Sequence, residues 1–344
     1  MNDSKPIRVL VVDDSAFARK VLRQSLEAHP GIEVVGIAAD GLEALEKIAA
    51  LAPDVVTLDL VMPELDGLGV LRQLAEIEAP PRVVVVSFSN EESELVVHAL
   101  QLGAVEFAKK PTALATDRLY DMSALLVQTV LRAARARTPT TRPSVPPAST
   151  RFGQLSTRRE LLVIGTSTGG PQALTRMLAA MPETFPIPVA IALHIPGEYT
   201  EALARRLDAG CALRVVEASD GLEVGAGLVV LAKGGMHLQL ERQEGRLLAR
   251  LTPTGASLYA PSVDLLFKSA AVACGRRTLA AVLTGMGDDG LLGAQAIVAA
   301  GGTVLTETES SCVIYGMPRC VREAGLSAGE ASIDEMVAAL IGSL

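Results

Sequence analysis

The chain has 344 residues, of which 49% are hydrophobic, and this predicts two domains, each with a buried core. Its formal net charge of −8 argues against a general nucleic-acid binder. No apolar run approaches the roughly 18–20 residues of a membrane span, and no signal peptide precedes the first expected strand, so we expect no membrane insertion. The four cysteines lack Cys-x-x-Cys spacing and are expected to be reduced thiols in a cytoplasmic protein.

The charge is unevenly distributed, which supports a division into three parts. Residues 1–131 carry a net charge of −9, residues 132–159 carry +7, and residues 160–344 carry −6. The middle part is rich in Pro, Ser, Thr and Arg and has few large apolar residues, so we expect it to be a flexible linker between two domains. Its positive charge either keeps it solvated or contacts an acidic partner.

The first domain is expected to be a doubly wound, flavodoxin-like (βα)5 fold, because five apolar stretches alternate with five amphipathic ones. The expected strands are Ile7–Val12, Glu33–Ala38, Val55–Leu58, Arg82–Val86 and Val105–Phe107. The expected helices lie near Ala16–Ala28, Leu42–Ala50, Leu68–Leu74, Ser93–Leu100 and Met122–Ala134. In such a parallel sheet the active crevice lies at the carboxyl ends of the strands.

Polar side chains follow the expected strands at that edge. Asp13 and Asp14 end the first strand and Asp59 ends the third, while Ser87 and Lys110 end the fourth and fifth. Three carboxylates in a small volume repel one another unless a cation lies among them, and hard oxygen ligands favour Mg²⁺. A hydroxyl and an ammonium group beside them could hold the oxygens of a phosphorylated Asp59. The plainer interpretation is a set of capping acids and a surface lysine.

These positions resemble the receiver domain of bacterial two-component response regulators over about residues 5–130. The matching residues are Asp13, Asp14, Asp59 within DLVMPELDG, Ser87, and Lys110 before Pro111. The resemblance implies that a histidine kinase supplies a phosphoryl group to Asp59. It places Ser87 and Phe107 at the positions of the switch hydroxyl and the switch aromatic residue, with Lys110 beside the phosphoryl group. It also implies an Mg²⁺ site formed by Asp14, Asp59 and the Val61 carbonyl, with Asp13 assisting.

From residue 160 onward we expect a second doubly wound parallel sheet, in a three-layer α/β/α arrangement. The expected strands are Leu161–Ile164, Val189–Leu193, Leu213–Val216, Leu228–Leu231, Thr278–Leu283 and Thr303–Leu305. The expected helices are Pro171–Met181, Tyr199–Leu207, Val263–Ala273 and Leu291–Ala300. Residues 237–251 alternate apolar and polar side chains around Gly245 and are typical of a hairpin.

A Gly-x-Ser-x-Gly turn, residues 165–169, follows the first of these strands and precedes Pro171. This pattern is typical of a serine raised on a sharp strand-to-helix bend. The free N–H groups at the start of the following helix favour a developing oxyanion nearby. Ser167 is therefore the candidate nucleophile of a serine hydrolase.

A serine nucleophile needs a base and an acid that orients the base. His194 directly follows the strand Val189–Leu193, at the same sheet edge as Ser167, and is the preferred base. His237, at the start of the hairpin, is the second candidate.

The strand Thr278–Leu283 runs into a glycine-rich turn that contains Asp288 and Asp289, both candidates for the acid. Such a turn can also direct backbone N–H groups at an oxyanion. A phosphate-binding loop is the competing interpretation, but neither glycine turn has the Gly-Lys-Ser/Thr ending or the Gly-x-Gly-x-x-Gly spacing. Asp264, in Pro-Ser-Val-Asp, is explained as an acid in the first turn of a helix.

These motifs together resemble the catalytic domain of the CheB family of chemotaxis protein-glutamate methylesterases, over about residues 160–344. The matching stretches are GTSTGG (165–170), HIP (194–196), PSVD (261–264), LTGMGDDG (283–290) and YGMP (315–318). The resemblance implies a triad of Ser167, His194 and Asp289, with oxyanion contacts from the backbone amides of Thr168 and Met286. The chain departs from the family pattern at Leu193, Lys233 and Ala260, where glutamine, proline and arginine are usual.

The resemblance implies a phosphorylation-activated esterase that hydrolyses glutamate methyl esters, and deamidates particular glutamines, on the cytoplasmic helices of chemoreceptors. The esterase site needs no cofactor on this interpretation. Two alternatives remain open at this point. One is a receiver-controlled binding module in which Ser167 performs no chemistry. The other is an esterase that serves a signalling array outside chemotaxis.

Overall fold

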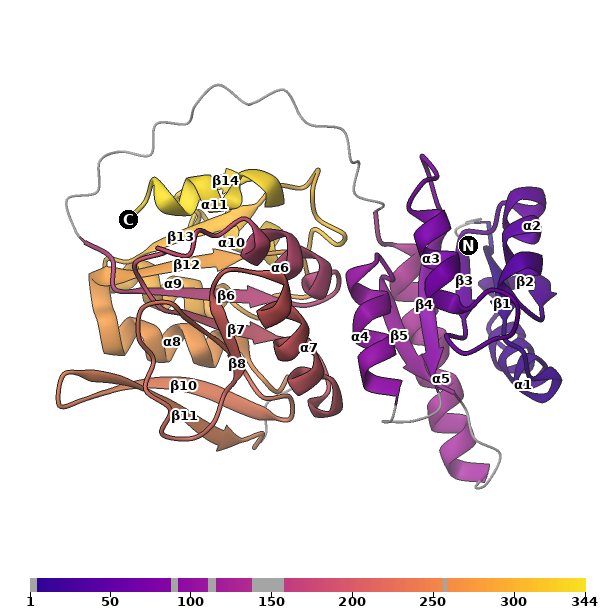
Figure 1. Ribbon diagram of the computed structural model, residues 1–344, viewed down its shortest axis with the longest axis horizontal. Helices are drawn as coiled ribbons and strands as arrows, with labels where there is room; N and C mark the ends of the chain where they lie inside the picture. The colour runs from indigo at the N-terminus through magenta and orange to yellow at the C-terminus, as the bar shows by residue number, and fades with distance from the viewer. Residues whose placement is uncertain (1–4, 88–91, 111–115, 138–157, 256–258) are drawn as a thin grey trace. The chain divides into compact units, whose positions relative to one another are not determined.

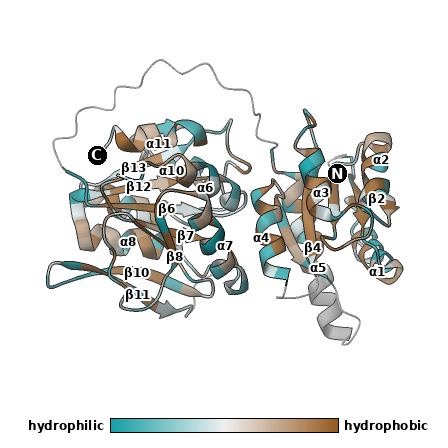
Figure 2. Cartoon of the chain, viewed as in Figure 1, coloured by the Kyte–Doolittle hydropathy of each residue, from teal (hydrophilic) through white to brown (hydrophobic). Residues whose placement is uncertain are grey.

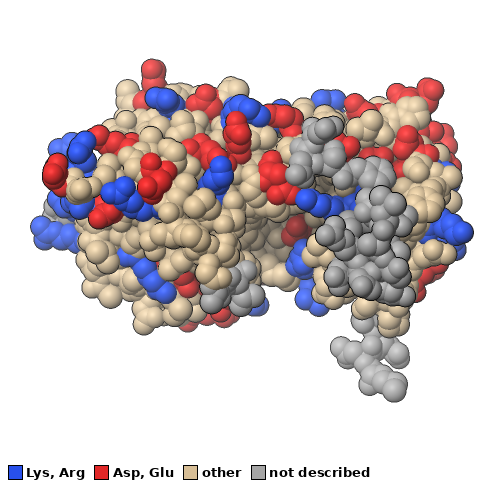
Figure 3. All heavy atoms as spheres, turned by 90° about the horizontal axis from the view of Figure 1, so that it is seen from below, with Lys and Arg blue, Asp and Glu red and all other residues tan. Residues whose placement is uncertain are grey.

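The structure is a computed structural model that describes residues 5–87, 92–110, 116–137, 158–255 and 259–344. Contacts divide the chain into two compact units, Met1–Thr138 and Pro139–Leu344, which we describe separately. Among the described residues, no helix combines the length and the apolar character needed to cross a membrane. In the face of each unit that Figure 3 shows, basic and acidic side chains are interspersed.

The first unit contains a five-stranded parallel sheet, as the sequence predicted, and its strand order is β2-β1-β3-β4-β5 (Figure 1). Its strands are β1 (Ile7–Val12), β2 (Ile32–Ala38), β3 (Val55–Leu58), β4 (Arg82–Ser87) and β5 (Glu106–Lys109). Its helices are α1 (Ala16–Glu27), α2 (Gly41–Leu51), α3 (Gly67–Leu74), α4 (Ser93–Gln101) and α5 (Thr116–Ala134). Contacts between α1 and α5, and among α2, α3 and α4, place helices on both faces of the sheet.

The second unit contains a seven-stranded parallel sheet in the order β14-β13-β12-β6-β7-β9-β8. Its strands are β6 (Leu161–Thr166), β7 (Val189–Leu193), β8 (Arg214–Glu217), β9 (Leu228–Leu231), β12 (Thr278–Val282), β13 (Thr303–Glu307) and β14 (Gly329–Ala331). A separate antiparallel hairpin, β10 (Met236–Gln243) with β11 (Arg246–Pro253), packs against a helix of this unit, as the alternating pattern of residues 237–251 predicted.

The helices of the second unit lie on both faces of the sheet (Figure 1). They are α6 (Gly170–Ala179), α7 (Gly197–Gly210), α8 (Val263–Cys274), α9 (Leu291–Ala299), α10 (Met317–Glu323) and α11 (Ile333–Ile341). The sequence reading assigned no element beyond the strand near residue 305, so it missed α10, β14 and α11. Ser332 and Glu335 form a capping box at the start of α11, which was the available signal.

The central strands are mainly apolar, as expected for strands whose two faces are both covered by helices. Every residue of β6 is buried, and Figure 2 shows the strands of both sheets as mainly hydrophobic. Both ends of the predicted linker contain packed residues: α5 extends to Ala134, Ala136 is buried, and Arg159 is buried in the second unit. The remainder of that prediction falls mainly on residues 138–157, which lie outside the described residues.

Candidate functional site

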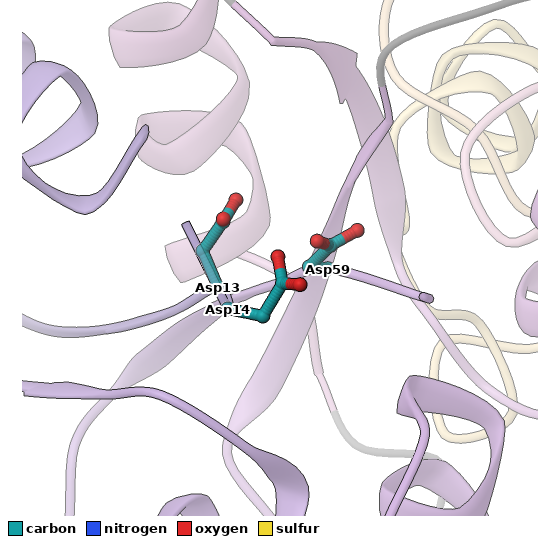
Figure 4. Close-up of side chains that lie close together, drawn as sticks. All are labelled: Asp13, Asp14 and Asp59. Carbon is teal, nitrogen blue, oxygen red and sulfur yellow. The ribbon is translucent and has the colours of Figure 1, made fainter. Parts of the chain in front are cut away.

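Three carboxylates meet at the carboxyl edge of the first sheet (Figure 4). Asp13 and Asp14 follow β1, and Asp59 follows β3, the strand beside it. One ligand oxygen from each lies within 4.8 Å of the others; Asp13 and Asp59 are buried and Asp14 is exposed. The arrangement offers only hard oxygen donors on a partly open site, which fits a small divalent cation.

Lys110, which follows β5, lies against this cluster. Its Nζ is 2.8 Å from Asp13 Oδ2 and 2.7 Å from Asp59 Oδ2, and its side chain is buried. Burial raises the pKa of the Asp59 carboxyl, and the hydrogen bond and positive charge of Lys110 offset only part of this effect. Asp59 is therefore a buried carboxylate whose charge is only partly compensated by the protein.

The other predicted receiver residues lie nearby. Ser87 ends β4 and is buried, and its hydroxyl donates a hydrogen bond to Glu92. Phe107 is half-buried on β5, and Val61 is exposed, with its N–H 3.4 Å from Asp59 Oδ1. The role of Glu92 as acceptor for the Ser87 hydroxyl was not foreseen from the sequence.

In the second unit, Ser167 lies at the sharp turn between β6 and α6. The Ser167 N–H donates to the Thr284 carbonyl at 3.0 Å, and the Ser167 carbonyl accepts from Gly170 at 2.8 Å. A Cβ on Gly285 would lie 2.8 Å from Ser167 Cβ, so only glycine allows the turn after β12 to pass so close to the serine. The serine is half-buried, and within the described residues its hydroxyl makes no hydrogen bond.

His194 lies beside Ser167 because of strand register. Thr166 on β6 pairs with Leu193 on β7, and the His194 N–H donates to the Thr166 carbonyl at 3.2 Å. Ser167 therefore directly follows the last paired residue of β6, and His194 directly follows the last paired residue of β7. His194 Nε2 lies 2.7 Å from Asp289 Oδ2, and the two side chains are 11% and 6% exposed. The structure thus brings together three of the predicted residues at one sheet edge.

The Asp289 carboxylate lies at the N-terminus of α8. It accepts the Ser262 hydroxyl at 3.0 Å, the Val263 N–H at 2.8 Å and the Asp264 N–H at 2.9 Å. Burial by itself raises the pKa of the Asp289 carboxyl, but the hydrogen bonds from His194 and from these backbone groups outweigh it and hold the pKa below its usual value. The positive end of the helix favours the same ionised form.

An ionised Asp289 can only accept a hydrogen bond, so the proton of the neutral His194 ring belongs on Nε2. The other ring nitrogen, Nδ1, is buried and has no hydrogen-bond partner in the described part of the protein. A buried acceptor with no partner costs free energy unless something fills its place. In the serine-protease triad the carboxylate instead binds Nδ1 and Nε2 faces the serine. Here the carboxylate binds Nε2, and Nδ1 is the nitrogen that has no described partner.

The structure also distinguishes the alternatives that the sequence left open. Asp288 is exposed, whereas its neighbour Asp289 is buried against His194. His237 is buried in the hairpin, where it accepts the Ser262 N–H at 3.2 Å on Nδ1 and bonds the Thr254 carbonyl at 3.0 Å through Nε2. Both of its nitrogens therefore bind backbone groups, which leaves none to accept a proton from a serine.

Asp264 does lie in the first turn of α8, and it has a further role. Its carboxylate accepts the N–H groups of Gly290 at 2.9 Å and Gly293 at 2.7 Å, at the N-terminus of α9. Burial raises the pKa of the Asp264 carboxyl, and these backbone hydrogen bonds only partly oppose the rise. Asp264 therefore caps the neighbouring helix and does not contact His194.

Backbone N–H groups near Ser167 differ in their availability. The Ser167 N–H is already bound to the Thr284 carbonyl, so it cannot serve an oxyanion. The Met286 N–H has no backbone acceptor within the described residues, and Met286 is half-buried in the turn after β12. Thr168 is buried at the start of the turn into α6.

Two residues that were not predicted to belong to the site, Thr284 and Glu307, stabilise the turn that carries Ser167 and Thr168. Thr284 donates its hydroxyl to the Thr168 carbonyl at 3.0 Å, and its N–H donates to Glu307 Oε2 at 2.8 Å. Glu307 ends β13, and burial raises the pKa of its carboxyl. The sequence signal was a glutamate two residues after the expected strand Thr303–Leu305, at the same edge as the other site residues.

The structure shows the contacts of the three residues that depart from the family pattern. Leu193 is buried, and its Cδ1 lies 2.5 Å from where a Cβ on Gly170 would be, so it packs on the first turn of α6. Lys233 forms an ion pair with Glu217 at 3.2 Å, and the Ala260 carbonyl accepts the Gly235 N–H at 3.1 Å. Ala260 contributes no cation to the site.

Comparisons with known proteins identify the family of each of the two units. Residues 162–340 match the family described as CheB methylesterase, and residues 9–122 match the response regulator receiver domain. The chain is 61% identical over 338 residues, 97% of each chain, to a Myxococcus xanthus protein named protein-glutamate methylesterase/protein-glutamine glutaminase 5. It is 40% identical over 323 residues, 93% of each chain, to a Thermotoga maritima protein of the same name without the numeral.

Among solved structures, the second unit is similar to the Thermotoga maritima CheB methylesterase catalytic domain. The TM-score is 0.53 at 37% identity, and the match covers 55% of this chain and all of that one.

Proposed function

The chain belongs to the CheB family of protein-glutamate methylesterases and glutaminases, and we propose that Ser167, His194 and Asp289 are its catalytic triad. One observation carries the assignment: the His194–Asp289 hydrogen bond leaves Nδ1 buried and without a described partner. His194 and Ser167 each follow directly after the last residue pair of β7 and β6, Leu193 and Thr166. A base needs an unprotonated nitrogen within reach of the nucleophile, and this is the nitrogen that the geometry provides.

In the proposed reaction, the Ser167 hydroxyl attacks the carbonyl carbon of a glutamate methyl ester while His194 Nδ1 accepts the proton. Asp289 stabilises the imidazolium that forms, because its carboxylate stays ionised among its hydrogen bonds. His194 then returns the proton to the leaving oxygen, and methanol departs. Water attacks the acyl-enzyme with His194 again acting as base, which releases glutamate and free Ser167.

The backbone N–H of Met286 is the proposed oxyanion donor, and the N–H of Thr168 is its proposed partner on the other side of the carbonyl. Support for the first comes from an N–H with no described backbone acceptor beside the serine turn. Where such donors have been removed singly in other enzymes, the turnover number fell roughly 10²–10³-fold. A glutamine side chain can react through the same steps, with ammonia as the leaving group, which accounts for the glutaminase activity.

The receiver unit is the proposed regulatory switch. Asp59 is the proposed phosphoacceptor, a histidine kinase the donor, and Lys110 and Ser87 the groups that hold the phosphoryl oxygens, with Phe107 as the switch aromatic residue. Asp13, Asp14, Asp59 and the Val61 carbonyl would hold Mg²⁺, and the cluster of close carboxylate oxygens fits such an ion. When bound, Mg²⁺ neutralises charge that develops on the transferred phosphoryl group.

The proposed substrates are the methylated cytoplasmic helices of chemoreceptors, which places the protein in the cytoplasm and its activity in sensory adaptation. We retain the sequence-based division into a receiver (1–131), a linker (132–159) and an esterase domain (160–344) as part of the proposal.

The decisive test measures methanol release from methylated chemoreceptor membranes, with and without Mg²⁺ and acetyl phosphate. Release that disappears in Ser167→Ala, and that rises with acetyl phosphate only when Asp59 is intact, supports both the catalyst and the switch. The matched variant for the switch is Asp59→Asn. If release persists in Ser167→Ala, the assignment of the nucleophile is wrong.

A further inference from the structure

The aromatic ring of Tyr259 lies flat on the imidazole of His194. The two ring centroids are 4.3 Å apart and the planes differ by 1°. Tyr259 is 37% exposed, so the ring covers one face of the histidine while part of it remains at the surface. At its far end the phenol oxygen lies close to the glycine turn after β12, since a Cβ on Gly287 would be 3.3 Å from it.

Hydrogen bonds to neighbouring segments hold the backbone that follows Tyr259 in place. The next residue, Ala260, accepts the Gly235 N–H at 3.1 Å, and Ser262 donates its N–H to His237 at 3.2 Å. Three donors of residues 262–264 bind the carboxylate of Asp289. One short segment, residues 259–264, therefore holds the acid through its hydrogen bonds and covers the histidine with its aromatic ring.

We propose that Tyr259 is a positioning residue that fixes the ring plane of His194 in the hydrolase site. A hydrogen bond to Asp289 at one ring nitrogen restrains that edge of the imidazole, but the ring can still rotate about the line of that bond. A flat aromatic surface removes this rotation and keeps Nδ1 directed to the same place. It also stabilises the positively charged ring formed when His194 accepts a proton, because cations are attracted to aromatic faces.

This inference rests on the proposed role of His194 as the base. The aromatic face carries the effect, so phenylalanine should replace Tyr259 without loss, whereas leucine should not. The two variants thereby distinguish the effect of the aromatic ring face from the effects of the phenol hydroxyl and of side-chain size. Val272→Ala provides a matched control, because Val272 is 89% exposed and lies outside the 259–264 segment.

The test uses the full chain and three readouts. The first is the rate at which a fluorophosphonate probe labels Ser167, which does not depend on receptor binding. The second is methanol release from methylated chemoreceptor membranes, separated into kcat and KM. The third is the chemical shift of the His194 ring protons, which can be assigned among the four histidines by comparison with His194→Gln. Stacked rings shift such protons upfield, and a residue with a purely structural role would not control this signal.

We expect Tyr259→Leu to lower the labelling rate and kcat by roughly 3- to 10-fold with KM within about twofold of the unsubstituted chain. The upfield shift should disappear in this variant and persist in Tyr259→Phe, whose rates should match those of the unsubstituted chain. The inference is overturned if Tyr259→Leu changes KM alone, if Tyr259→Phe loses as much as Tyr259→Leu, or if the ring protons do not move.

A failure of the proposed function gives a different result. In that case the unsubstituted chain would not be labelled at Ser167 at all, and the positioning role would fall with it. Normal labelling of both the unsubstituted chain and Tyr259→Leu would overturn only the role of Tyr259.

Discussion

The carboxylates of Asp264 and Asp289 each cap the helix next to the other residue. Asp289, just before α9, accepts the first N–H groups of α8, and Asp264, in the first turn of α8, accepts two N–H groups at the start of α9. Each carboxylate thus accepts free N–H groups at the N-terminus of the helix that lies beside its own chain segment. The position of the proposed catalytic acid is consequently set by the packing of two helices.

Asp289→Asn tests the chemical part of this arrangement. The asparagine side chain cannot stabilise a charged imidazole, and its amide can force the wrong proton arrangement on His194, so we expect kcat to fall roughly 10³–10⁴-fold. The neighbouring variant Asp288→Asn alters an exposed carboxylate and should retain activity within about twofold. Equal losses in the two variants would contradict the assignment of the acid.

Asp264→Ala tests the structural part. It removes the acceptor for the N–H groups of Gly290 and Gly293, and loss of a helix cap typically costs about 0.5–2 kcal/mol of folding free energy. We expect an unfolding free energy lower by about 1–2 kcal/mol in urea titrations of the second unit. An unchanged unfolding midpoint would show that α9 does not depend on this cap.

Gly285→Ala tests the close packing under the nucleophile. The new methyl group would lie 2.8 Å from Ser167 Cβ and 2.4 Å from Met317 Sδ, so the serine turn has to move. A displacement of about 1 Å at a reacting group can cost on the order of 10²-fold in rate. We expect a comparable loss in fluorophosphonate labelling with far-ultraviolet circular dichroism unchanged. Gly210→Ala, where a Cβ meets nothing within 4 Å, is the matched control.

Glu307 gives a pH-dependent prediction for stability. Burial raises the pKa of its carboxyl in the folded chain above 4.5, so the folded state holds the proton more tightly than the unfolded state. Its contribution to stability is full below pH 4.5 and is lost as the pH rises through the raised value.

Glu307→Gln keeps an acceptor for the Thr284 N–H and cannot ionise. We therefore expect the variant to gain in unfolding midpoint relative to the unsubstituted chain as the pH is raised from 4 to 8, measured by calorimetry. A difference between the two chains that stays constant over this range would contradict the burial argument.

Mg²⁺ should stabilise the first unit if the acidic cluster binds it. Ligand binding to the folded state alone adds RT ln(1 + [L]/Kd), which is about 2.7 kcal/mol at one hundred times Kd. We expect Mg²⁺ to raise the unfolding midpoint of that unit, and Asp14→Asn to remove the effect while leaving the metal-free midpoint nearly unchanged, because Asp14 is exposed. Stabilisation that survives in Asp14→Asn would exclude this residue as a ligand.

The sequence alone determined that both domains are α/β folds, and it determined which edge of each sheet carries most of the candidate site residues. Alternation of apolar runs with amphipathic stretches is a local property, and it predicted the parallel sheets that the structure contains. Because the carboxyl ends of parallel strands share one edge, the residues that follow the strands could be grouped without coordinates. Asp13, Asp59 and Lys110 were grouped in one domain by this argument, and Ser167 and His194 in the other.

Only the tertiary structure decided which neighbours meet. Asp288 and Asp289 are adjacent in the chain, and the direction of a tight turn, which no periodicity encodes, sends one to solvent and the other to His194. His237 fits the local pattern of a candidate base, yet the hairpin packs it against backbone groups. Tyr259 lies 65 positions from the histidine that it covers, so only the folding of distant segments onto one another brings these rings together.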